Sequence, residues 1–334
     1  MEHLGFPVET IIVFIVFVLV AFCIDFMAHK KDDVISLKSA VIWSVFWVVI
    51  SVLFGLYIYY HHGSEMASLF FAGYALEKAL SVDNLFVMMA IFSWFKIPEI
   101  YRHRVLYFGI LGAIIFRLIF VAIGSSLLML SSWVEIVFAF VVAYTAIMML
   151  KGTDDGDEIE DYSQHLAYRL VYKYFPVFPR FVGHSFFISR NQAKKEIQKD
   201  KSIKFISKKG LFIATPLFLC LCVVEVSDVM FAFDSVPAII AVSREPLIIY
   251  SAMIFAILGL RTLYFVLEAL KRYLIYLEKA VIVLLFFIAF KLLVNGINHI
   301  FNLGFEISAN LSLIIILTIL AVGIIASYLF PEKN

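Results

Sequence analysis

The chain has 334 residues, of which 63% are hydrophobic, 16% are aromatic and only 16% are charged. Because soluble domains carry about 25% charged residues, this composition excludes an ordinary soluble protein. The formal net charge of +1 gives no indication of a nucleic-acid partner or of acidic ligands.

Long apolar runs follow one another along the whole chain. A helix needs about 20 apolar residues to cross roughly 30 Å of hydrocarbon, and its backbone groups must be satisfied within the segment. The runs therefore predict an all-α, polytopic transmembrane helical bundle with about nine spans. They occupy residues 9–29, 40–60, 67–95, 105–130, 133–150, 211–241, 246–269, 275–300 and 308–330.

Basic residues alternate between the gaps that separate these spans. Each odd-numbered gap is rich in lysine or arginine, whereas Arg244 is the only lysine or arginine in the even-numbered gaps. Positive charge marks the cytoplasmic side of a membrane protein. We therefore expect a multi-pass membrane protein with the N-terminus outside and the C-terminus inside.

The order of spans and loops predicts five segments. The polar loop begins with an acidic run and ends in lysines, and we interpret it as a partly helical cytoplasmic loop whose basic end meets anionic headgroups. The segments are a two-span N-terminal part (1–66), a three-span unit (67–151), the loop (152–210), a second three-span unit (211–301), and a last span with its tail (302–334).

The two three-span units repeat the same order of polar residues. Matching positions are Glu77 with Asp228, Asp83 with Asp234, Asn84 with Ser235, Arg117 with Arg261, and Lys151 with Lys291. Because each unit has three spans, the second enters the membrane from the opposite side. Inverted repeats of this kind are typical of transporters, which place the substrate site near the midplane where the repeats meet.

Carboxylates lie within or near the ends of the apolar spans, where a central charge costs roughly 3 kcal/mol. These acids are Asp25, Glu77, Asp83, Glu225, Asp228 and Asp234, and the opposing cations are Arg117, Arg261 and Lys291. The excess of acid suits a cation. With the Asn84 amide and the Ser81 and Ser235 hydroxyls, the ligand set is all oxygen, as Mg²⁺, Ca²⁺ and Mn²⁺ prefer.

Two interpretations of these acids stay open. They could form structural ion pairs with Arg117 and Arg261 instead of a cation site. Asp25, near the inner end of the first span, could reach the interface beside the following lysines or guard a cytoplasmic entrance.

Helix geometry separates the acids of each unit. At about 100° per residue, Glu77, Ser81 and Asn84 share one face, while Asp83 lies about 120° away. Either the acids serve two neighbouring faces or the helix unwinds between them. Pro237 would weaken the hydrogen bonds around Asp234, and broken helices often line transporter sites.

These motifs resemble the TerC family, particularly its Alx-type bacterial members, over nearly the whole chain. The residues concerned are Glu77-Lys-Ala-Leu-Ser-Val-Asp83-Asn84, Phe-Ala-Phe-Asp234-Ser-Val-Pro237, Phe-Ala-Ile-Leu-Gly259-Leu-Arg261, and Asp25 before the first basic loop. The resemblance implies a LysE-like transporter of the cytoplasmic (inner) membrane and, for the Alx-type branch, Mn²⁺ export. The family name comes from tellurium resistance, and plastid relatives are associated with protein insertion into thylakoid membranes.

Our leading prediction is a secondary transporter that exports Mn²⁺ as its transported ion and holds no permanent cofactor. Asp83, Asn84, Asp228 and Asp234 would bind the ion, Glu77 and Glu225 would be ligands or proton carriers, and Arg117 and Arg261 would neutralise the acids after release. No nucleotide-binding GxxxxGK[ST] motif is present, so we expect an ion gradient or the membrane potential to drive transport, with protons as one candidate coupling ion.

The competing prediction is a membrane scaffold that does not transport and acts in tellurite or envelope stress or in protein insertion. An enzyme is not expected, because neither H-E-x-x-H nor G-x-S-x-G occurs. The expected partners are the lipid bilayer and a divalent metal ion, without nucleic acid. Whether the chain forms a homo-oligomer stays open.

Overall fold

The computed structural model describes residues 2–3, 6–28, 36–131, 133–152, 162–200, 212–270, 275–301 and 307–330. The side chains of Lys151 and Asp234 lie outside this description. The long helices are α1 (Val8–Ala28), α2 (Leu37–Trp94), α3 (Glu99–Leu130), α4 (Trp133–Gly152), α7 (Pro216–Val242), α10 (Ile275–Phe301) and α11 (Ala309–Leu329). The shorter elements are α8 (Pro246–Ile257), α9 (Leu260–Leu270), η1 (Tyr162–Gln164), α5 (Leu166–Tyr174), α6 (Arg190–Lys199), and the strands β1 (Glu2–His3), β2 (Phe6–Pro7), β3 (Phe187–Ile188) and β4 (Ile213–Ala214).

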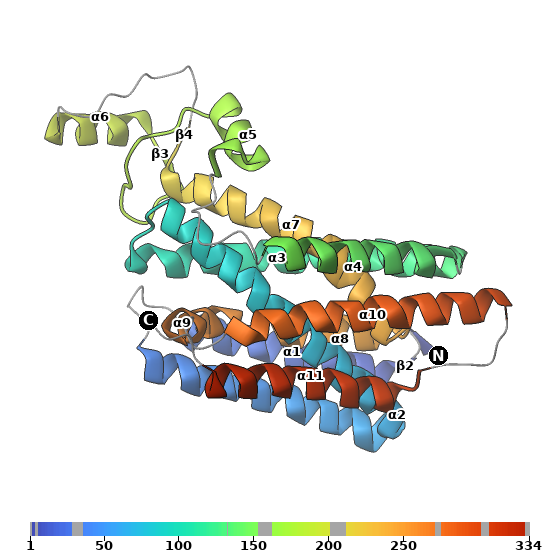
Figure 1. Cartoon of the computed structure of the whole chain (residues 1–334). Coiled ribbons are helices and arrows are strands. Elements are labelled where there is room, and N and C mark those ends of the chain that lie inside the picture. Colours follow the sequence, from blue (N-terminus) through green and yellow to red (C-terminus); the bar gives the residue numbers. More distant parts are fainter. Residues whose placement is uncertain are drawn as a thin grey trace.

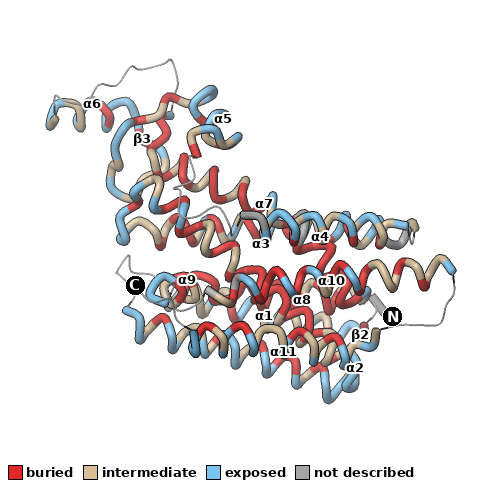
Figure 2. Tube along the Cα trace, in the orientation of Figure 1, coloured by how far each residue is buried: buried red, intermediate tan, exposed pale blue. Residues whose placement is uncertain are grey.

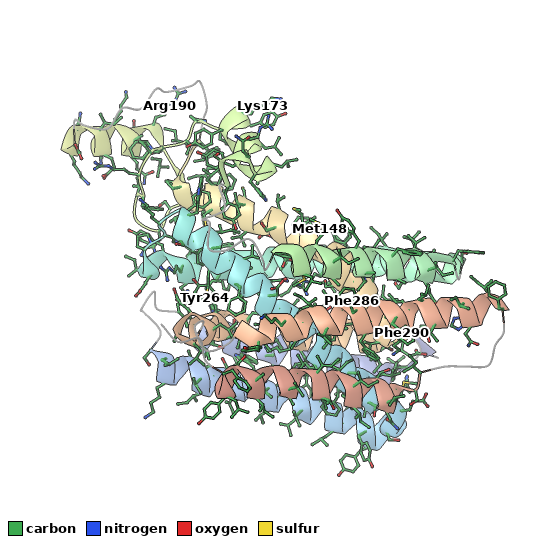
Figure 3. The ribbon with its side chains drawn as sticks, viewed as in Figure 1. Met148, Lys173, Arg190, Tyr264, Phe286 and Phe290 are labelled. Carbon is green, nitrogen blue, oxygen red and sulfur yellow. The ribbon has the colours of Figure 1, made fainter. Side chains whose placement is uncertain are left out.

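The predicted all-α membrane fold is confirmed. Within the described residues, six helices are long and apolar enough to cross a membrane, or up to eight if each of two bent pairs is one span. Large apolar side chains also cover the outside of the bundle, as Met148 and Phe290 do at 53% and 58% exposure (Figure 3). An apolar exterior suits contact with lipid, which offers no hydrogen-bond partners.

Helix α2 is too long for one crossing and folds back on itself. Its 58 residues are interrupted at Gly63, whose φ of 86° lies in a region that favours glycine. The rings of Phe54 and Phe70 lie 5.4 Å apart, although 16 residues of straight helix would separate them by about 24 Å. Counting the two arms as separate spans, and each bent pair as one, gives the nine spans expected from the sequence; that count remains a prediction.

The helices stack in layers (Figure 1). Helix α11 packs on α2 and α10, α10 packs on α4, and α3 packs on α7. Helix α8 lies at the centre, and ten of its residues are buried, as Figure 2 shows for this part of the bundle. The N-terminus and the C-terminus lie at opposite ends of the bundle (Figure 1), which is the arrangement that an odd number of crossings produces.

Two spans depart from a straight helix. In α7, Pro216–Ala232 and Ser235–Val242 meet at an angle of 40°, just before Pro237. Helices α8 and α9 meet at 53° at Gly259, whose φ is 77°. A Cβ at Gly259 would overlap the Trp47 ring, so both the backbone and its packing require glycine here.

The described part of the predicted loop 152–210 contains a small folded unit. Strands β3 and β4 pair antiparallel, and Phe178, Ile188, Ala193 and Ile213 form its apolar core. Figure 1 shows this unit, with α5 and α6, beyond one end of the bundle. The acidic run 154–161 and Lys208-Lys209 lie outside the described residues, and the domain boundaries predicted from the sequence remain predictions.

Candidate functional site: a buried charge network

Arg117 joins acids from both predicted repeats. From the middle of α3, its Nη1 lies 2.6 Å from Glu77 Oε2 on the second arm of α2, and its Nη2 lies 3.5 Å from Asp228 Oδ1 on α7. The Arg117 and Glu77 side chains are 2% and 1% exposed. Buried charges of this kind persist only when they are paired and hydrogen-bonded, so these three residues form one electrostatic unit.

Asn84 completes the network on the α2 side. With its amide oriented to satisfy its neighbours, its oxygen accepts a hydrogen bond from Arg117 Nη2 at 2.7 Å, and its nitrogen donates to the Leu80 carbonyl at 3.2 Å. Ser81 is also fully buried. The shared face expected for Glu77, Ser81 and Asn84 is therefore the inward face, while Asp83 is half-buried beside it.

Glu225 enters the same region one turn before Asp228. It packs against α3 at Gly112, where a Cβ would overlap the Glu225 carboxylate. Glycine therefore makes the room that this acid occupies. Within the described residues, Glu225 Oε2 and Asp228 Oδ2 are buried without a hydrogen-bond partner. Unused carboxylate oxygens are ligands of the kind that a hard divalent cation takes.

The described residues include only part of the predicted cation site. Ser235 is buried on α7 beside Asp234, but the Asp234 side chain lies outside the description. No group of three or more acids, histidines or cysteines lies close enough to hold a metal ion in the part of the chain that the structure describes. The site of Glu77, Asp83, Asn84, Glu225, Asp228 and Asp234 therefore remains a prediction.

Arg261 has a different partner from Arg117, its match in the predicted repeat. On α9, its Nη2 lies 2.9 Å from Asp25 Oδ2 and donates to the Asp25 carbonyl at 3.1 Å. The guanidinium also lies 5.9 Å from the centre of the Tyr107 ring. Asp25 thus forms an ion pair that joins α1 to the broken α8–α9 span, and its role at the interface or at a cytoplasmic entrance remains a prediction.

Lys78 stabilises the break at Gly259. Its Nζ donates to the Ala256 and Leu258 carbonyls at 3.0 and 3.2 Å. These carbonyls lie at the end of α8, where the break removes their helical partners. The sequence places Lys78 away from the face that carries Glu77 but does not identify its role. The one feature of the sequence that could have indicated a helix break for Lys78 to stabilise is Gly259, in an otherwise regular apolar run.

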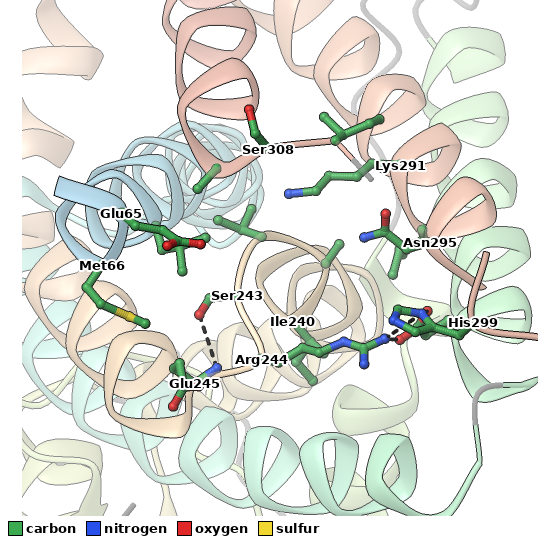
Figure 4. A pocket seen from close by; sticks show the side chains of 17 residues that line it. Glu65, Met66, Ile240, Ser243, Arg244, Glu245, Lys291, Asn295, His299 and Ser308 are labelled. Atoms are coloured by element: carbon green, nitrogen blue, oxygen red, sulfur yellow. Dashed lines mark hydrogen bonds and ion pairs between the residues drawn. The ribbon is translucent and has the colours of Figure 1, made fainter. Parts of the chain in front are cut away.

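A second polar region lies at the end of the bundle that holds the N-terminus. There, Glu135 on α4 forms an ion pair with Arg244, and its Oε2 lies 3.1 Å from His299 Nδ1. Lys291 on α10 lines a cavity of about 360 Å³ in this region (Figure 4). The sequence pattern indicates only an ordinary span-end residue at Glu135, because its partners come from segments more than 100 positions away in the chain.

Long apolar helices, two bent spans and a buried charge network define a polytopic α-helical membrane protein. No solved structure matches the chain. The family described as "Integral membrane protein TerC family" matches residues 62–334 of the chain. The chain therefore belongs to this family.

Relatives share nearly the full length. A protein of Serratia marcescens named "Tellurium resistance protein TerC" is 64% identical, over 99% of this chain and 96% of its own. An "Uncharacterized membrane protein" of Rickettsia bellii is 36% identical over 92% of this chain and 91% of its own. A "Putative membrane-bound redox modulator Alx" of Photorhabdus laumondii is 34% identical, over 90% of each.

Proposed function

We propose that the protein is a secondary transporter that exports divalent metal cations from the cytoplasm, with Mn²⁺ as the principal cargo. The observation that supports this most is the bridge made by Arg117 between Glu77 of one predicted repeat and Asp228 of the other. Substrate sites of inverted-repeat transporters lie where the two repeats meet.

The charges around Arg117 support a site that exchanges one cation for another. Glu77 and Asp228 bring two carboxylates to one guanidinium, and Glu225 lies one turn before Asp228. One oxygen of Asp228 and one of Glu225 have no hydrogen-bond partner in the described residues. In this proposal, a divalent cation binds the acids in place of Arg117, and the arginine returns when the ion leaves. The exchange keeps the buried acids neutralised throughout.

The bent spans support movement around such a site. Transporters commonly use discontinuous helices, whose halves rock against each other while the site stays fixed. Here α7 bends at 40° just beyond Asp228, and the α8–α9 break rests on Lys78. We further propose that the chain takes part in tellurium resistance, which two relatives carry in their names.

Flux into liposomes that contain only this protein tests the proposal. We expect Mn²⁺ flux across a pH step to exceed Mg²⁺ and Ca²⁺ flux, and Asp83→Asn, Asp228→Asn and Asp234→Asn to abolish it. Glu268→Gln is the matched control, because Glu268 pairs with Arg102 and takes no part in the proposed site. Wild-type Mn²⁺ flux in all three acid variants would refute the site.

A membrane scaffold is the second candidate, and the small folded unit favours it. Its own apolar core next to α7 holds this unit together as a folded body on which another protein could dock. Replacement of residues 162–200 by a flexible linker distinguishes the two functions. Intact Mn²⁺ flux with loss of tellurite resistance supports the scaffold, whereas loss of resistance in the acid variants alone supports export.

A further inference from the structure

The cavity of about 360 Å³ contains a buried cation that the charge network around Arg117 does not use. Lys291 is 3% exposed, and no ion pair or hydrogen bond holds its ammonium among the residues that the structure describes. A charge buried without a partner costs several kcal/mol, so such groups normally face a ligand or a functional cavity. Figure 4 shows the Lys291 side chain pointing into the cavity.

The wall around Lys291 favours an anion. Helices α8 and α11 both begin at the cavity, at Pro246 and Ala309, and a helix N-terminus carries partial positive charge. Asn295, one turn after Lys291 on α10, also lines the cavity. Its amide nitrogen can donate a hydrogen bond to an anion, whereas its Oδ1, which is buried without a partner in the described structure, is an acceptor. The Lys291 ammonium, the Asn295 amide and the starts of α8 and α11 therefore meet at this cavity.

The opposite wall carries carboxylates. Glu65 points toward the Lys291 side in Figure 4, and Glu245 lies at the start of α8. Glu135 is already neutralised, since Arg244 and His299 contact it. A ligand between Lys291 and Glu65 must present anionic oxygens on one side and a hydrogen-bond donor on the other, because an ionised carboxylate only accepts hydrogen bonds.

We propose that this cavity binds a small oxyanion that retains one proton, such as hydrogen phosphate or hydrogen tellurite. Its anionic oxygens accept hydrogen bonds from Lys291 and the Asn295 amide, and its hydroxyl donates to Glu65. The site differs in its residues from the one proposed for metal export and does not depend on it. On the predicted orientation, the cavity opens to the outside of the cell.

Heat stability of the purified full-length protein in detergent tests the site, because a ligand that binds only the folded state stabilises it by an amount that grows with the logarithm of ligand concentration above the dissociation constant. At constant ionic strength, we expect inorganic phosphate and tellurite to raise the unfolding midpoint with this concentration dependence, and sulfate, which has no proton near neutral pH, to do so far less. Calorimetric titration with phosphate gives the dissociation constant directly.

Three variants separate the proposed role from a structural one. Lys291→Gln should weaken phosphate binding at least tenfold, Lys291→Arg should retain it, and Glu65→Gln should let sulfate bind as phosphate does. Lys279→Gln is the control, since Lys279 is exposed on the same helix outside this cavity. Asn295→Ala provides a second loss variant should Lys291→Gln not fold. Equal phosphate affinity in the wild type and in the loss variant used would overturn the proposal, as would equal stabilisation by sulfate.

Discussion

Arg117 is the residue on which the buried network depends. It forms ion pairs with both Glu77 and Asp228, and all three side chains are almost fully buried. Removing one partner of a buried ion pair is far more costly than the pair is worth, because the remaining charge stays in the low-dielectric interior. The network therefore fixes α2, α3 and α7 to one another.

We expect Arg117→Met to destabilise the protein by roughly 3–5 kcal/mol, the cost of leaving buried acids unpaired. Unfolding midpoints in detergent measure the loss. Arg261→Met is the matched comparison and should cost less, because the Asp25 side chain is 21% exposed and water can replace its partner. Adding Glu77→Gln and Asp228→Asn to Arg117→Met should restore stability; a triple variant no more stable than the single one would contradict this account.

Which residues carry buried charge was predictable, but their partners were not. Glu77, Arg117 and Asp228 stand out because a charged residue inside an apolar run needs a reason. Pairing is a property of the fold: Arg261 matches Arg117 in the sequence pattern, yet it contacts Asp25 of a helix outside both repeats. Lys291 was expected as a supporting charge, and its cavity became visible only when four distant helices were in place.

At the scale of elements, hydropathy located the helices well. The predicted spans 275–300 and 308–330 correspond to α10 and α11 within a few residues, because the length of an apolar run is set by bilayer thickness. The break between α8 and α9 was missed. Glycine is common inside membrane helices, so Gly259 alone did not predict a break. Contacts with Trp47 and Lys78, from distant parts of the chain, maintain it.

We expect Gly259→Ala to destabilise the protein by about 2–3 kcal/mol, from an unfavourable backbone conformation together with overlap against Trp47. Gly183→Ala is the control: Gly183 also has a positive φ, of 53°, but a methyl group added there would meet no other atom within 4 Å, so it should cost only about 1 kcal/mol. Unfolding midpoints in detergent compare the two variants. Equal losses would show that packing on Trp47 does not hold the break.

At the scale of the whole molecule, the packing has the pattern that two related units would produce. The first predicted unit contains the second arm of α2, then α3 and α4, and the second contains α7, the α8–α9 pair and α10. The contact of α3 with α7 therefore corresponds to the contact of α8 and α9 with α2, because the matching helices take each other's places. The contacts of α4 with α10 and of α2 with α7 are unchanged by the same exchange. This agreement supports the inverted repeat, which remains a prediction.

The predicted orientation can be tested by labelling thiols from one side of the membrane. Three spans separate residue 64, at the fold of α2, from residue 195, on α6, so the two positions should face opposite sides. In a variant with Cys23, Cys220 and Cys222 replaced by alanine or serine, we expect Ser64→Cys to react with an impermeant maleimide on intact cells. Lys195→Cys, on an exposed position, should react only after the membrane is opened. Reaction of both positions on intact cells would mean that an even number of crossings lies between them, and the two repeats would then have the same orientation in the membrane.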